Sequence, residues 1–137
     1  MELLLIKNGM AAPFLIEECA YEGVRRIGEA VASDIELVTG CRPRIMTERE
    51  LDAERERYAE GRPDMAKGTG SGQECKTFTA DRVIFCATLG KSPLLEQLAE
   101  KRKQGEDGAE PDWSEIAGKR EVYRIFMAEN PFPGVEQ

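Results

Sequence analysis

Histidine is absent from this 137-residue sequence. Its absence excludes Ser-His-Asp triads, histidine general bases and histidine metal ligands together. The cysteines do not indicate a metal or redox site either, because no two of them have the C-x-x-C spacing of such a site. We therefore expect no metal, no cofactor and free thiols at Cys19, Cys41, Cys75 and Cys86. Any chemistry within the chain would need carboxylate, lysine, tyrosine or cysteine side chains.

Long apolar runs are also missing. The run near the start, residues 3–6, is far shorter than the roughly 20 residues of a membrane-spanning helix. Glu2 stands where a signal peptide carries basic residues, and Lys7 ends the run too early for one. The sequence therefore predicts a cytoplasmic chain with no membrane partner.

Basic residues are outnumbered by acidic ones. The chain has 19 Lys+Arg and 26 Asp+Glu, which gives a net charge of −7. Such a chain would repel phosphate unless it carried a strong basic patch, and none is evident, so we expect no nucleic-acid partner. The 41% of hydrophobic residues are clustered and suffice for one modest core. We expect a single domain over residues 1–137.

Two segments carry the signals of helices that pack on a core. Over residues 21–39 apolar side chains recur at helical spacing, and Gly40 suits the left-handed residue that ends a helix. This stripe consists of Val24, Ile27, Val31, Ile35 and Val38. A second helix begins with Ser92 as its N-cap and Pro93 at its first position, and it ends by Gly105.

A third, more polar helix is expected after Thr47. Thr47 and Glu50 form a capping box, which predicts a helix over residues 48–60. Residues 61–80 are rich in glycine and poor in apolar side chains, so we expect a mobile surface loop there. We interpret residues 47–80 as an insertion.

Short apolar runs predict the strands. They lie at residues 3–7, 14–16, 44–46, 82–87 and 121–128. The turn dipeptide Asn8-Gly9 suggests that the first two runs pair as a hairpin, and the unbroken run at 82–87 is typical of a central strand. Alternating strands and helices predict an α/β fold, a layered sheet of about 4–5 strands flanked by two main helices plus the polar helix.

The connection after residues 82–87 is the leading candidate site. Gly90-Lys91-Ser92 resembles the end of a P-loop, but Phe85 stands where that motif needs its first glycine. A capped helix is the better interpretation. Free amides at its start, together with Lys91, still favour a negative charge. We therefore nominate Thr88, Gly90, Lys91 and Ser92 as ligand or interdomain contacts.

Other motifs favour structural roles. The glycines of residues 68–72 neither follow a strand nor open a helix, so a dinucleotide site is not expected there. The carboxylates at 17–18, 48–52 and 106–112 lie in polar runs, which indicates a solvated face rather than a pair of catalytic acids. Trp113 is more typical of a core or interface residue than of a sugar platform.

Three segments resemble one family in the same order. They read DIELVTGCRP at 34–43, VIFCATLGKSPLL at 83–95, and WSEIAGKRE at 113–121 followed by NPFPGV at 130–135. Together they are similar to the N-terminal domain of glycoside hydrolase family 115, the xylan α-1,2-glucuronidases. Arg120 and Cys86 depart from the family pattern, which often has Trp and Gly there.

The resemblance implies an inverting enzyme that removes (4-O-methyl)glucuronic acid from glucuronoxylan. It also implies that the catalytic carboxylates belong to a downstream (β/α)₈ barrel, which these residues do not include, so no catalytic residue is carried over. The expected role is a non-catalytic α/β domain, a fragment of the longer enzyme, whose loop at residues 88–92 faces the barrel or a sugar carboxylate.

Two alternatives remain open at this point. The chain could be a stand-alone carbohydrate-binding or adaptor module, or a small anion- or nucleotide-binding α/β protein. The interpretation as a fragment also predicts an unpaired sheet edge or an exposed apolar face. A homodimer through that surface is then expected.

Overall fold

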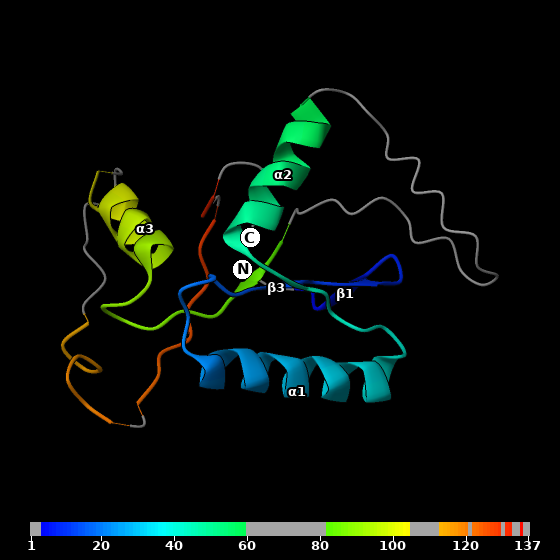
Figure 1. Ribbon diagram of the computed structural model, residues 1–137, viewed down its shortest axis with the longest axis horizontal. Helices are drawn as coiled ribbons and strands as arrows, with labels where there is room; N and C mark the ends of the chain where they lie inside the picture. The colour runs from blue at the N-terminus through cyan, green and yellow to red at the C-terminus, as the bar shows by residue number, and fades with distance from the viewer. Residues whose placement is uncertain are drawn as a thin grey trace.

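Helices and short strands alternate along the chain in the computed structural model (Figure 1). It describes residues 4–59, 82–104, 113–120, 122–129, 131–132 and 135. The elements are β1 (Ile6–Lys7), β2 (Met10–Ala11), β3 (Phe14–Leu15), α1 (Glu22–Thr39), β4 (Ile45–Met46), α2 (Glu48–Ala59), β5 (Ile84–Phe85) and α3 (Pro93–Gln104). The α/β class predicted from the sequence is confirmed.

The described strands form two sheets. In the larger sheet the order is β4-β3-β5, and both neighbours run parallel to β3, with Phe14 opposite Ile45 on one side and Ile84 on the other. Among the described strands β3 is therefore central, and residues 82–87, which we expected in that place, supply a strand at one edge. An apolar run alone does not determine sheet order, because a strand at the edge of the described sheet can also be covered on both faces by helices and loops.

The first strand forms a hairpin, but with residues 10–11 and not with the expected residues 14–16. Asn8 and Gly9 have φ angles of 54° and 74°, the left-handed values that a tight type I′ hairpin turn requires. The turn joins β1 to β2, with Ile6 opposite Ala11. Residues 14–16 are too far along the chain to pair across so short a turn, which is why they enter the parallel sheet instead.

Side chains alternate between the two faces of the sheet. Leu15, Met46 and Val83 share one apolar cluster with Leu51 of α2. Their neighbours Phe14 and Ile16 share the other cluster with Ala32 of α1. This is the period-two pattern of strands buried on both sides. Helices α1 and α2 accordingly lie on opposite sides of the sheet (Figure 1).

Helix α1 has the predicted length and the predicted end. Gly40 takes φ 73°, and its amide donates to the Glu36 carbonyl at 2.8 Å. Its contact face only partly matches the expected stripe: Val24 and Ile35 pack against the core beside the buried Gly28 and Ala32, whereas Ile27 and Val38 are 67% and 85% exposed. The small residues let the helix approach the sheet, because a Cβ on Gly28 would lie 2.6 Å from Ile16 Cδ1.

Helix α2 begins with the predicted capping box. The Glu50 amide donates to Thr47 Oγ1 at 3.4 Å, and the Thr47 amide donates to the Glu50 carboxylate at 2.8 Å. Leu51 is buried on the sheet, so this polar helix docks through a narrow apolar contact. The expected loop at 61–80 lies outside the described residues.

The strand predicted at 121–128 is not formed over residues 122–128, the part of it that the structure describes. Residues 122–128 run without helix, turn, bend or ladder, and residues 122–127 are exposed. Just before them the chain makes a single turn, in which the Ala117 amide donates to the Trp113 carbonyl at 2.7 Å. Strand propensity is expressed only when a neighbouring strand accepts the ladder. The described part of the main sheet therefore has three strands.

Candidate functional site at the carboxyl edge of the sheet

The carboxyl ends of the three parallel strands meet at one edge of the sheet. The chain passes from β3 to β4 on one side and then crosses to β5 on the other side of β3. Such a reversal of strand order creates the crevice in which open α/β sheets bind their ligands. The loops that bound it follow β3 and β5, and the second of these contains the nominated residues 88–92.

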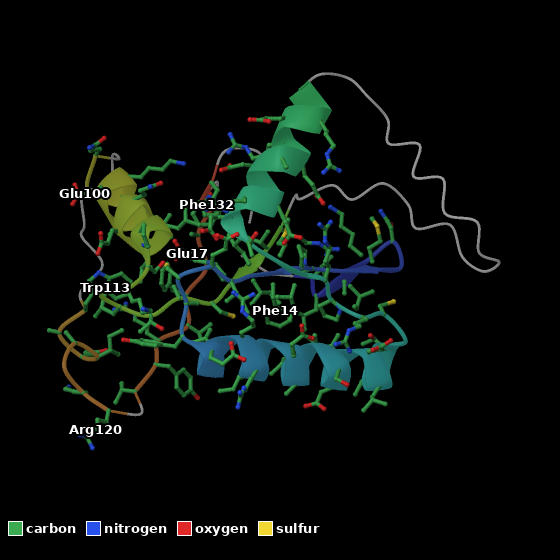
Figure 2. All side chains as sticks on the ribbon, in the orientation of Figure 1. Phe14, Glu17, Glu100, Trp113, Arg120 and Phe132 are labelled. Atoms are coloured by element: carbon green, nitrogen blue, oxygen red, sulfur yellow. The ribbon has the colours of Figure 1, made fainter. Side chains whose placement is uncertain are left out.

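Glu17 occupies the centre of this edge. It lies two residues after the end of β3, and its side chain is buried, with only 3% exposed. Its Oε1 accepts a hydrogen bond from the Leu94 amide at 3.0 Å, and its Oε2 accepts one from the Ser92 hydroxyl. Figure 2 shows Glu17 between the end of β3 and the start of α3. The carboxylate therefore sits where the amino-terminal end of α3 favours negative charge.

Ser92 completes the cap of α3. Its Oγ accepts a hydrogen bond from the Leu95 amide at 3.1 Å, as predicted for an N-cap residue. The same oxygen donates to Glu17, so Ser92 connects the helix cap to the strand end. The anion-binding position expected at this helix is consequently filled by a carboxylate of the chain itself.

Lys91 faces the loop that follows β3. Its Nζ lies 4.4 Å from the centroid of the Tyr21 ring, within the range of a cation–π contact. The Lys91 carbonyl accepts a hydrogen bond from the Cys19 thiol at 3.4 Å. Lys91 is thus half-buried between two loops rather than extended toward an open pocket.

Thr88 and Gly90 shape the turn before Ser92. The Lys91 amide donates to the Thr88 carbonyl at 3.1 Å, and Gly90 takes φ 77°, a value that glycine adopts without strain. All four nominated residues lie in one connection at the carboxyl edge. Ser92 caps the helix, Thr88 and Gly90 form the turn, and Lys91 alone presents a charge.

The same edge also reaches helix α2. The Glu18 amide donates to the Glu48 carboxylate at 2.9 Å, and the Glu18 carboxylate lies 3.4 Å from Arg49. The adjacent residues Glu17 and Glu18 therefore join the starts of α3 and α2 to the end of β3. These contacts fix the end of β3 relative to both helices.

Sequence reasoning missed Glu17. It was placed on a solvated face because it adjoins Glu18, yet the structure buries it. One signal could have identified it: Glu17 directly follows the apolar run 14–16, so it lies at the edge where strands end. Its partner Ser92 is far away in sequence, and no local pattern reveals that pairing.

Glu50 and Asp52 are exposed, as predicted for a solvated face, and the carboxylates at 106–112 lie outside the described residues. Glu50 lies 3.8 Å from Arg44, and Asp52 lies 2.8 Å from Arg55. Among the described residues no group of three or more Asp, Glu, Cys or His side chains could hold a metal ion. Exposed ion pairs of this kind contribute little to stability.

The other motifs are structural where the structure describes them. The Trp113 ring lies 6.0 Å from Phe126, so it packs against another aromatic side chain. Burial raises the pKa of the Cys86 thiol, which makes it a poor nucleophile near neutral pH. Cys19, Cys41 and Cys86 are free thiols, whereas Cys75 and residues 68–72 lie outside the described part.

Comparisons with known proteins returned no match. A scan against protein-family models, a search of curated proteins and a search of solved structures each found nothing similar to this chain. No helix in the described residues has the length and apolar character needed to cross a membrane.

Proposed function

We propose that this chain is a non-catalytic α/β domain that supports the catalytic barrel of an α-glucuronidase acting on glucuronoxylan. The observation that carries the proposal is the closure of the carboxyl edge by Glu17. In a ligand-binding α/β domain this edge would be left open for the ligand. Here a buried carboxylate occupies the edge and connects the end of β3 to the start of α3 by hydrogen bonds. This arrangement favours a structural role for the domain.

The segments that resemble the glucuronidase family support the same role. The first covers the end of α1 and leads toward β4, and the second covers β5, the turn and the start of α3. In the third, Phe132 and Val135 are buried in the cluster on the α2 side of the sheet. The resemblance is therefore concentrated in residues that build the domain rather than in a reactive cluster.

The proposed contact with the barrel is the connection at residues 88–92. Ser92, the residue after Lys91, is fixed by its hydrogen bonds to Glu17 and to the Leu95 amide. These bonds restrict the position of the Lys91 backbone. A positioned ammonium group is suited to a carboxylate, either of the neighbouring barrel or of the glucuronic acid beside it. This part of the proposal makes Lys91 an interdomain residue.

The Lys91→Ala variant of the complete enzyme tests this assignment. We expect a lower kcat/KM or a lower melting temperature, because the variant loses both its charge and its contact with the Tyr21 ring. Lys7→Ala is the matched control, since Lys7 is an exposed lysine on β1. Kinetics and melting temperature that both match the wild type would contradict the interdomain role.

One observation favours a second candidate, a carbohydrate-binding module. The Tyr21 and Tyr123 side chains are exposed, and aromatic rings can stack on sugars. Calorimetric titration with xylo-oligosaccharides and glucuronic acid separates the two roles. The scaffold predicts no binding by the isolated chain, whereas saturable binding that is lost in Tyr123→Ala would favour the module.

The anion- or nucleotide-binding alternative makes a different prediction. If α3 offered its amino-terminal end to a ligand, phosphate or ATP would raise the melting temperature. With Glu17 in that position we expect no shift from either compound. A concentration-dependent shift would show that the carboxylate can be displaced.

A further inference from the structure

Two contacts join the loop after β3 to Lys91. The Cys19 thiol donates a hydrogen bond to the Lys91 carbonyl at 3.4 Å, and the Lys91 Nζ lies over the Tyr21 ring, 4.4 Å from its centroid. The Lys91 amide donates to the Thr88 carbonyl at 3.1 Å. Both backbone polar groups of Lys91 therefore have partners, and the Tyr21 ring holds the charged end of its side chain.

The Tyr21 side chain is not used to cap helix α1, although Tyr21 is the N-cap residue. It makes no side-chain capping hydrogen bond, and the cap is closed by the backbone, since the Val24 amide donates to the Tyr21 carbonyl at 3.0 Å. Serine, threonine, aspartate and asparagine are preferred at this position because their side-chain oxygens accept from helix amides. Tyrosine at the N-cap therefore fixes an aromatic ring at the start of α1, where it meets Lys91.

The contact with the ring changes what Lys91 can do. A lysine carries its ammonium group on a flexible four-carbon stem, and ordering that stem costs up to about 2 kcal/mol of conformational entropy. An ammonium group that already lies on an aromatic face loses less entropy when it meets a partner. Because the ring covers one side of the group, N–H donors on the other side stay directed away from it.

We propose that Tyr21 is a positioning residue for Lys91 in the interdomain contact, an inference that rests on the proposed function. Tyr21 is 57% exposed, so it also places an aromatic surface beside the ammonium group. Tyrosine is enriched among the residues that dominate binding at interfaces. The partner that fits both parts is a carboxylate that adjoins an aliphatic side chain or the C–H face of a sugar, rather than an isolated anion such as phosphate.

Proton NMR of this chain is the first test. An aromatic ring shields protons that lie over its face, so the Hε signal of Lys91 should appear upfield of an ordinary lysine signal. Tyr21→Leu should remove this shift, whereas Tyr21→Phe retains the ring and should retain it. Tyr123→Leu is the matched control, since it removes another exposed tyrosine and should leave the Lys91 signal in place. A Lys91 signal that does not move in Tyr21→Leu would overturn the proposal.

The complete enzyme provides the second test. Tyr21→Leu should weaken the contact about two- to fivefold, which corresponds to the energy of an exposed cation–π pair. Tyr21→Phe should restore the wild-type value, because the ring and not the hydroxyl holds the ammonium group. A Tyr21→Phe enzyme as impaired as Tyr21→Leu would contradict a role for the ring.

The two possible sources of the carboxylate give different readouts. If it belongs to the glucuronic acid, Tyr21→Leu should raise KM. If it belongs to the barrel, the same variant should lower the melting temperature and leave KM unchanged. In either case Tyr21→Leu should have no further effect in a Lys91→Ala background, since the two side chains form one unit. Additive effects would contradict positioning through Lys91.

These tests also distinguish the positioning role from the interdomain contact. The Lys91 signal depends only on this chain, so its failure to respond to Tyr21→Leu overturns the positioning role alone. A Lys91→Ala enzyme that matches the wild type in kinetics and melting temperature would instead contradict the interdomain contact itself.

Discussion

The carboxyl edge beside Glu17 and the segment 122–127 are opposites in burial and polarity. At the edge a charged side chain is buried, and each of its carboxylate oxygens has a hydrogen-bond partner. In the segment apolar side chains are exposed, and no strand among the described residues pairs with its backbone. The first is a closed site whose partners come from its own chain. The second is open over the part of the chain that the structure describes.

The largest effect should come from the residue that anchors the chain just after the open segment. Phe132 is buried, and its ring meets Phe85 edge-to-face at 5.4 Å. We expect Phe132→Ala to lower the free energy of unfolding by about 3–5 kcal/mol, because it leaves a cavity in the core. Urea denaturation measures the loss.

Phe126→Ala is the control for that variant. Phe126 belongs to the open segment and is partly exposed, so its loss should cost only about 1 kcal/mol. Equal losses for the two phenylalanines would remove the distinction between anchored and open regions.

The closed site should show the next largest effect. Glu17→Ala leaves the Leu94 amide and the Ser92 hydroxyl without their buried acceptor. We expect a loss of about 1–3 kcal/mol in the free energy of unfolding, measured by urea denaturation. Glu17→Gln should lose less, because its carbonyl oxygen can still accept from the Leu94 amide.

A double-mutant cycle with Ser92→Ala sharpens this prediction. Since the two side chains share one hydrogen bond, their effects should not add. Additive losses, or a Glu17→Ala variant as stable as the wild type, would mean that the edge is not closed by this pair.

The smallest effect is expected in the open segment. Ile125→Ser should change the free energy of unfolding by less than about 0.5 kcal/mol, as measured by urea denaturation, because its side chain is 85% exposed. The matched change Ile16→Ser, at a fully buried isoleucine, should be strongly destabilising. A large loss at Ile125 would show that the segment is packed within the monomer.

Local signals predicted the helices well. The capping box at Thr47, the N-cap at Ser92 and the left-handed Gly40 are all formed as expected. Each of these depends on residues within one helical turn, so the sequence contains the whole interaction. The α/β class followed from the same alternation of local patterns.

Features that depend on residues far apart in the chain could not be predicted from local sequence patterns. The place of β3 at the centre of the described sheet depends on pairings with Ile45 and Ile84, which no local pattern encodes. The contact face of α1 combines Val24 and Ile35 of the predicted stripe with the small buried residues Gly28 and Ala32, whose close approach to the sheet no apolar pattern shows. Glu17 was missed for the same reason, since its partners lie in a distant loop.

The pairing of β3 with two strands also sets the order in which the sheet can close. Joining Phe14 to Ile45 requires a much shorter loop than joining Phe14 to Ile84. The β3–α1–β4 unit should therefore assemble first, with β5 arriving in the later step of folding. Each doubling of a flexible loop costs only about 0.6 kcal/mol of closure entropy. The connection between α2 and β5 can consequently vary in length at little thermodynamic cost, at the expense of a slower final step.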